Sequence, residues 1–379
     1  MNVVMFILNA LFVLVVIAGL CIALGRYQAK LRQTKAEQTK KERLAYEAEM
    51  VKAWLEASPE ERKAMDFGKP CLDDGEALVC YSNLTSYELI QFLHAGADPN
   101  AVPNPMATIK TTPLQLVDDA ERLKILLEFG ADPNGVVHYI RPKSNLVGHM
   151  TPIFTHLHNL EMLEMLLSYG ADPNCDAYPS DDGCSGYVPL SFARAREEVE
   201  LLIKYGANVN VGCLKTTPLV CAISMCQEDV GYIDVVKALL DAGADVNSKA
   251  VNNSLRTPLL LTTYSGWDKN QIARVEIVRL LIDAGVDVNY KDKKGFTAIA
   301  SCFSPYEEVP LEIAIALIDA GADTDQVMNP ENKYAEEMRQ CRPDIVEAIR
   351  TKETRLKDKI LANIDLPQQE EAPKAQRRM

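Results

Sequence analysis

The stretch LLEFGADPN, residues 126–134, returns along the chain in near copies. These copies read LLSYGADPN from Leu166, LLIKYGANVN from Leu201 and LLDAGADVN from Leu239. Two adjacent leucines followed by a glycine describe a short amphipathic helix that ends at a residue able to adopt the left-handed cap conformation without a Cβ penalty. The Asp and Asn that follow favour a turn. The recurrence predicts that the architecture itself repeats.

The glycines that end these copies are spaced like the units of a solenoid. Successive units are 34, 40, 36, 37, 42 and 36 residues long, a spacing typical of repeat architectures. A second motif precedes most of the glycines, in which a Thr caps a helix and a Pro fits its first turn. The glycines are Gly96, Gly130, Gly170, Gly206, Gly243, Gly285 and Gly321, and the capping motifs begin at Thr112, Thr151, Val188, Thr217, Thr257 and Thr297. Each unit is expected to fold as helix, turn, helix, glycine stop and extended finger.

Because the two motifs keep their mutual order, residues 72–350 resemble the ankyrin-repeat family. The resemblance implies an all-α solenoid of six to seven helix-turn-helix repeats with a C-terminal cap, hairpin-like fingers along one edge and a concave face that binds proteins. The chain departs from the family where a histidine usually follows the Thr-Pro-Leu step, so the hydrogen bonding of that histidine must be absent or remade. The residues found there are Gln115, Phe154, Ser191, Val220 and Leu260.

Both ends of the array are atypical, as expected because the outer faces of a stack meet water. Residues 76–100 keep the second helix but lack Thr-Pro-Leu, and residues 333–350 supply two helical pieces without a glycine stop. Residues 351–379 are polar and are expected to form a disordered tail.

The N-terminus is predicted to be a single-pass transmembrane helix within residues 1–25. Residues 3–24 carry no charge and one strongly polar side chain, Asn9, and are long enough to cross about 30 Å of hydrocarbon. Seven Lys and Arg residues follow between Arg26 and Arg43, which favours an N-out, C-in orientation with the repeats facing the cytoplasm. A cleaved leader peptide stays an alternative, although the apolar run is long and no basic residue precedes it.

Residues 26–71 are predicted to form a charged, helical juxtamembrane linker. Sustained a/d heptads are absent, which favours a solvated spacer over a dimerising coiled coil. Ser58, Pro59 and Glu61 predict an N-cap, an N1 proline and a capping box for a further short helix.

The charge balance argues against nucleic acid as a partner, because that affinity rests on basic side chains meeting phosphate. The net charge is -13, and residues 71–350 carry 22 Lys plus Arg against 40 Asp plus Glu. This acidity either keeps an elongated surface soluble or indicates a protein partner with a basic surface.

Ten cysteines are present, without a CxxC pair or a zinc-like cluster. Free cytosolic thiols are the favoured interpretation. Cys71 with Cys80, and Cys175 with Cys184, sit nine residues apart in predicted loops, so a bridge in an oxidising compartment stays open for each pair.

No motif predicts catalysis, a cofactor or a metal site. A phosphate-binding glycine loop, a His-Glu-x-x-His helix and a nucleophile elbow are all missing. His156 and His158 are two apart, so on a helix they would point away from each other. We expect no enzyme activity.

Candidate partner contacts lie on the two longest fingers, because aromatic and arginine side chains on loops often anchor interfaces. The candidates are Tyr139, Ile140 and Arg141 on the first finger, Tyr178 and Tyr187 on the second, and Trp267 further on. The alternative is that these side chains fold back and cover neighbouring helices.

These features predict a membrane-anchored scaffold or adaptor that mediates protein–protein interaction at the cytoplasmic membrane face. An extracytoplasmic binder, such as an immunity-type inhibitor built from the same repeats, is the second interpretation and requires the opposite topology. The sequence does not predict an oligomeric state.

Overall fold

The computed structural model describes most of the chain, which divides into two compact units. The backbone is described for residues 2–68, 84–101, 111–140, 147–176, 187–211, 216–248, 257–263, 267, 270–304, 309–329, 331–332 and 335–364, and the side chains likewise except for 2–25, 27, 137–149 and 358–364. The first unit holds residues 1–103 and 116–130, and the second holds 104–115 and 131–379.

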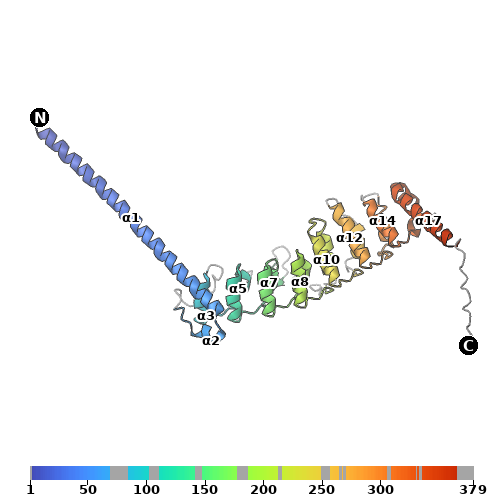
Figure 1. Cartoon of the computed structure of the whole chain (residues 1–379), viewed down its shortest axis with the longest axis horizontal. Helices are drawn as coiled ribbons and strands as arrows, with labels where there is room; N and C mark the ends of the chain where they lie inside the picture. Colours follow the sequence, from blue (N-terminus) through green and yellow to red (C-terminus); the bar gives the residue numbers. More distant parts are fainter. Residues whose placement is uncertain are drawn as a thin grey trace, which may run out of the picture. The chain divides into compact units, whose positions relative to one another are not determined.

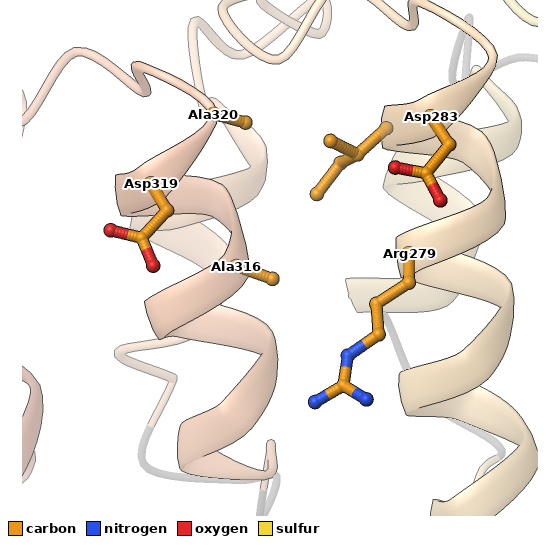
Figure 2. A pocket seen from close by; sticks show the side chains of 6 residues that line it. Arg279, Asp283, Ala316, Asp319 and Ala320 are labelled. Carbon is orange, nitrogen blue, oxygen red and sulfur yellow. The ribbon is translucent and has the colours of Figure 1, made fainter.

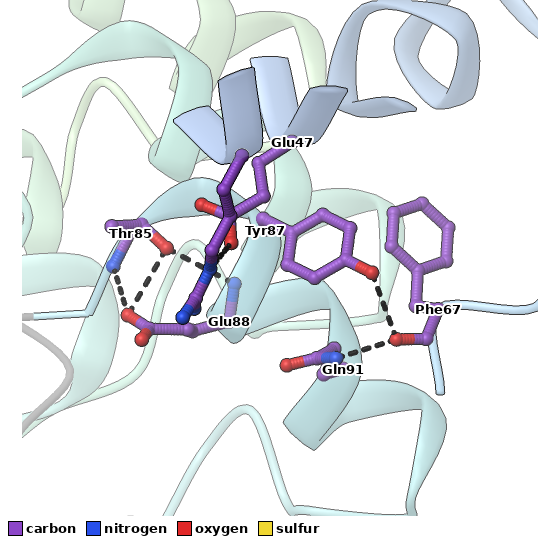
Figure 3. Close-up of polar contacts among 7 residues, drawn as sticks. Glu47, Phe67, Thr85, Tyr87, Glu88 and Gln91 are labelled. Atoms are coloured by element: carbon purple, nitrogen blue, oxygen red, sulfur yellow. Dashed lines mark hydrogen bonds and ion pairs between the residues drawn. The ribbon is translucent and has the colours of Figure 1, made fainter. Parts of the chain in front are cut away.

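The described residues of the first unit contain four helices. They are α1 (Asn2–Glu56), α2 (Pro59–Ala64), α3 (Ser86–His94) and α5 (Ala120–Glu128). The predicted capping box is confirmed at α2, where the Glu61 backbone N–H donates to Ser58 Oγ and the Ser58 N–H donates to the Glu61 carboxylate at 2.8 Å. A second capping box, formed by Thr85 and Glu88, starts α3 (Figure 3).

The C-terminal turns of α1 pack against α3 instead of remaining in water. Val51 and Trp54 are buried, and the Trp54 ring stacks on Phe129 with a centroid distance of 5.4 Å and an interplanar angle of 3°. The Phe67 carbonyl accepts a hydrogen bond from Tyr87 Oη at 3.1 Å (Figure 3). The prediction of a solvated spacer over 26–71 is therefore wrong for the C-terminal part of that segment. The apolar residues Val51 and Trp54 in that part are buried instead of facing water.

Arg62 fastens the end of α1 to the repeat. Its Nε donates to the Trp54 carbonyl at 2.9 Å and its Nη2 donates to the Leu55 carbonyl at 3.2 Å, so it supplies donors to carbonyls in the last turn of the helix, where intrahelical donors run out. The guanidinium carbon lies 4.6 Å from the Trp54 ring centroid, and Nη1 pairs with the Glu128 carboxylate at 2.5 Å.

The predicted transmembrane segment, residues 3–24, falls in the backbone of α1, but its side chains lie outside the described residues. Over the part of the chain that the structure does describe, no helix combines the length and the apolar character needed to cross a bilayer.

The second unit confirms the predicted alternation of helices. We call the helix after each capping motif the opening helix and the helix before each glycine the closing helix. The opening helices are α4 (Pro113–Leu116), α6 (Pro152–His156), the 3-10 helix η2 (Pro189–Phe192), α9 (Pro218–Met225), α11 (Pro258–Thr263) and α13 (Ala298–Ser301). The closing helices here are α7 (Leu160–Ser168), α8 (Arg196–Lys204), α10 (Tyr232–Asp241), α12 (Gln271–Asp283) and α14 (Leu311–Asp319). Successive closing helices lie side by side from α7 to α14 (Figure 1).

Each repeat ends at a glycine in the left-handed conformation, as predicted. The seven glycines have φ between 83° and 96°, a region that other residues enter only with strain. A turn follows each glycine and, in all but the last copy, contains the Asn of the repeated motif, which we call the loop Asn. The residue two positions before the loop Asn closes this turn, as where Asp172 Oδ1 accepts from the Asn174 backbone N–H at 2.8 Å.

The loop Asn has a role that the sequence does not predict, because its side chain joins one repeat to the next. Asn174 Nδ2 donates to the Gly206 carbonyl at 3.0 Å, and its Oδ1 accepts from the Asn208 N–H at 2.7 Å. The same pair of cross-repeat bonds is made by Asn134, Asn210 and Asn289. We call this series the asparagine ladder. In the last copy, Asp325 replaces the Asn.

The C-terminal cap contains α15 (Asp325–Met328), α16 (Ala335–Cys341) and α17 (Pro343–Ile364). Because α17 packs on α14 and continues to Ile364, the prediction that disorder begins at residue 351 is wrong for residues 351–364. Residues 365–379 lie outside the described part.

The leucine pairs form the core, although unequally. Leu126 and Leu127 are both buried, whereas Leu239 is fully buried and Leu240 is only half-buried. One further hairpin, β1 (Val137–Ile140) with β2 (Val147–Met150), is the only sheet among the described residues, so the all-α class holds apart from this finger.

Candidate partner-binding surface

The two kinds of helix differ in their content of charged residues. The opening helices contain no Asp, Glu, Lys or Arg, whereas every closing helix of the second unit carries at least two. The opening helices follow one another, with η2 against α9, α9 against α11 and α11 against α13. We call the surface that they leave exposed the opening-helix face.

On the closing helices, ion pairs link neighbouring repeats. Lys204 pairs with Glu164 at 2.7 Å, and Lys237 pairs with Glu276 at 2.7 Å. The hydrogen bond to Glu276 is the main reason that the pKa of Lys237 is raised. These pairs are solvent-exposed, and such pairs contribute at most about 1 kcal/mol each. They therefore add little to the stability of the stack.

Three aromatic rings gather on the opening-helix face. Phe192 of η2 contacts Phe154 of α6 at a centroid distance of 5.9 Å and Tyr187 at 5.5 Å, both edge to face. Tyr187 is 43% exposed and Phe192 is 38% exposed. We call Phe154, Tyr187 and Phe192 the aromatic patch. Rigid aromatic area that remains open to solvent is the usual anchor of a protein interface.

Of these three residues, the sequence singled out only Tyr187. Phe154 occupies the position of the usual histidine, and Phe192 lies one position further along its own repeat. An aromatic residue just after the Thr-Pro-Leu step, where other repeats have Gln or small or aliphatic residues, was the available signal.

The first long finger folds as the predicted hairpin. In its antiparallel register Tyr139 pairs with Gly148 and Ile140 pairs with Val147, but the side chains of these residues are not described. Gln115 ties the hairpin to the repeat, because its Nε2 donates to the Met150 carbonyl at 2.9 Å. The same amide accepts from the Thr112 N–H at 3.2 Å, so the hydrogen bonding at the usual histidine position is remade there.

Two other predicted contact residues, Arg141 and Tyr178, lie outside the described residues. Trp267 is described, and the structure corrects its assignment as a partner contact. Its side chain is fully buried, and its Nε1 donates to the Leu261 carbonyl at 3.2 Å. A large ring with one satisfied donor packs in the core.

The two histidines considered as ligands serve local contacts. His156 is buried with Nε2 2.6 Å from the Leu114 carbonyl, and its burial lowers the pKa of the imidazole. His158 Nδ1 lies 3.1 Å from Glu198 Oε1. Where side chains are described, no cluster of His, Cys, Asp or Glu could hold a metal ion.

The described cysteines are free thiols. Burial raises the pKa of Cys175 to about 11 and of Cys302 to about 12, which makes both poor nucleophiles. Cys175 Sγ lies 3.2 Å from Thr151 Oγ1. Its predicted alternative partner, Cys184, and the pair Cys71 and Cys80 lie outside the described residues.

A groove of about 370 Å³ separates closing helices α12 and α14 (Figure 2). It is lined by the apolar residues Ile282, Ala316 and Ala320 and by the charged residues Arg279, Asp283 and Asp319. The lining carries both signs of charge, so the groove by itself identifies no ligand.

Comparison with known proteins agrees with this architecture. A family model described as ankyrin repeats in three copies matches residues 155–250, and an ankyrin-repeat model matches residues 254–293. The Caenorhabditis elegans ankyrin repeat and KH domain-containing protein mask-1 is 34% identical over 143 residues, which are 37% of this chain and 5% of that protein. This chain therefore aligns with only a small part of that relative.

Among solved structures, an ankyrin repeat domain from Acinetobacter baumannii is similar, with 23% identity and a TM-score of 0.44. The alignment covers 56% of this chain and 98% of that domain. The family models match the predicted ankyrin repeats over residues 155–250 and 254–293.

Proposed function

We propose that the chain holds a protein partner on its opening-helix face while an N-terminal helix anchors it in a membrane. The repeats act by occupancy, without turnover, so the anchor raises the effective concentration of the partner at the bilayer surface. Ankyrin repeats are protein-interaction modules, and this is the part of the proposal that the family matches support most directly.

The exposed aromatic patch is the observation that carries the proposal. Exposing an aromatic ring to water is unfavourable, so covering it with a partner contributes strongly to the free energy of binding. Since Tyr187 and Phe192 lie against each other and next to Phe154, one partner segment can cover them together.

The charge distribution indicates what that segment should be. The opening helices contain no Asp, Glu, Lys or Arg, and most of their side chains are apolar, so the partner should present an apolar, uncharged surface to them. A basic partner, which the overall acidity suggested, would instead meet the closing helices.

The membrane anchor and the cytoplasmic orientation rest on the sequence. Residues 3–24 are uncharged, and seven basic residues follow within the exposed part of α1. Replacing Val13 and Ile17 by Lys in the full chain should release it from carbonate-washed membranes, because a lysine at the bilayer centre costs roughly 2.5–3.5 kcal/mol. Recovery of the unmodified chain in the soluble fraction would refute the anchor, and a reporter fused after Met379 would test the orientation.

Quantitative affinity capture tests the binding surface. We expect the double variant Tyr187→Ala/Phe192→Ala to lose at least about 90% of specific partner capture, which corresponds to about 1.4 kcal/mol. The matched control is Ile315→Ala, an aliphatic side chain on α14 that is 41% exposed. Equal capture by both variants, with unchanged melting temperatures, would exclude the aromatic patch.

A further inference from the structure

A second group of exposed apolar side chains lies away from the aromatic patch, at the turn between α9 and α10 and at the start of α12. Met225 is 43% exposed, Val230 is 54% exposed and Ile272 is 86% exposed. Single exposed apolar residues are ordinary, so their significance depends on whether these three lie together.

Asn270 brings the two segments together. Its Nδ2 donates to the Cys226 carbonyl at 3.2 Å and to the Gln227 carbonyl at 2.9 Å. Met225 directly precedes this acceptor pair, and Ile272 follows the donor by two residues. We call Met225, Val230 and Ile272 the tip patch.

The support beneath the tip patch is buried. The Asn270 N–H donates to the Trp267 carbonyl at 3.2 Å, and both the Trp267 ring and the Cys226 side chain are fully buried. Ala273 and Ile277 supply the core contacts of α12, so Ile272 is not needed for packing. Its side chain is therefore available to a partner without disturbing the fold.

Acidic residues follow Met225 and Val230 in the described part of the chain. Glu228 and Asp229 are exposed on the same turn, and Asp234 is exposed in the first turn of α10. Lys237 lies 3.8 Å from Asp234 and is engaged by Glu276 at 2.7 Å. Exposed apolar side chains with acidic neighbours complement an aliphatic segment that carries positive charge, and they repel an anionic lipid surface.

We propose that the tip patch is a second docking surface, for a protein segment that presents Leu, Ile or Val flanked by Lys or Arg. It differs from the aromatic patch in chemistry, since its exposed apolar side chains carry no rings and have acidic neighbours. The two surfaces would let one array hold two different partners at once.

A peptide library selected on the full chain tests the proposal. Random 16-residue peptides displayed on phage are selected on the immobilised chain and counter-selected on the Ile272→Ser variant. We expect the surviving peptides to combine aliphatic with basic residues, and a synthesised representative to bind Ile272→Ser at least tenfold more weakly. The matched control, Ile315→Ser, should bind the peptide like the unmodified chain.

Two further variants make the result specific. Glu228→Gln should weaken the peptide several-fold and reduce the salt dependence of binding, whereas Phe192→Ala should leave binding unchanged, which separates this surface from the aromatic patch. The proposal is overturned if no peptide survives counter-selection, if the survivors lack basic residues, or if sedimentation shows self-association of the chain that Ile272→Ser abolishes. In that last case the occupant is a second copy.

Discussion

The asparagine ladder predicts a specific loss of stability when one of its residues is removed. In the variant Asn210→Ala, the Gly243 carbonyl loses a donor at 3.2 Å and the Asp245 N–H loses an acceptor at 2.7 Å. A net hydrogen bond is worth roughly 0.5–1.5 kcal/mol, so we expect the free energy of unfolding to fall by about 1–3 kcal/mol. The value should lie toward the lower end because the loop is exposed and water can replace part of the interaction.

Urea unfolding followed by circular dichroism measures this loss. Because repeat arrays unfold as coupled neighbouring units, hydrogen exchange should accompany it and should show faster exchange on both sides of the missing contact. The control is Asp325→Asn at the last copy, where no further glycine-ended repeat follows. That variant should stay within about 0.5 kcal/mol of the unmodified chain. If Asn210→Ala is as stable as the control, the ladder does not hold the repeats together.

Three further predictions concern the cap, the buried histidine and the finger. Arg62→Ala should destabilise the first unit by about 1–3 kcal/mol, because it removes a helix cap, a cation–π contact and a partly buried ion pair. Hydrogen exchange at the end of α1 should become faster, and unchanged exchange would contradict this prediction. The pKa of His156 is lowered in the folded state, so the unfolded chain binds more protons and stability should fall as pH decreases below about 6.5. Urea midpoints at pH 7.5 and 5.5 measure the loss, which His156→Gln should reduce; an equal pH dependence in that variant would refute the assignment. Tyr139→Ala should leave the melting temperature unchanged and weaken partner capture, and normal capture would remove Tyr139 from the binding surface.

The periodic parts of this fold could be predicted because each depends on local physics. A glycine that must adopt positive φ and a Pro that fits only the first turn mark helix ends within a few residues. The positive φ of Gly170 and Gly206 and the start of α9 at Pro218 follow from those rules.

Features that depend on contacts between repeats could not be predicted in this way. Asn174 is a good turn former, but its cross-repeat bonds exist only when two turns stack in register. Trp54 and Trp267 are both large rings with polar neighbours in sequence, and both are buried. No local sequence pattern predicts that burial. The docking of α1 was missed for the same reason.

The candidate surface was predicted in kind but only partly in position. Tyr187 was found because it lies on a long finger, whereas Phe192 was missed because its exposure depends on how η2 faces the solvent. The lack of charge on the opening helices can be read from the sequence once the helices are sorted by their place in the repeat.

Site-specific photo-crosslinking tests the central claim most directly. A photoreactive phenylalanine analogue is placed at position 192 of the full chain, and in a second preparation at position 315 on α14. We predict a discrete crosslinked protein from position 192, lost when Tyr187→Ala is added, and none from position 315. Crosslinking at both positions to the same extent, or at neither, would contradict the claim that the opening-helix face binds the partner.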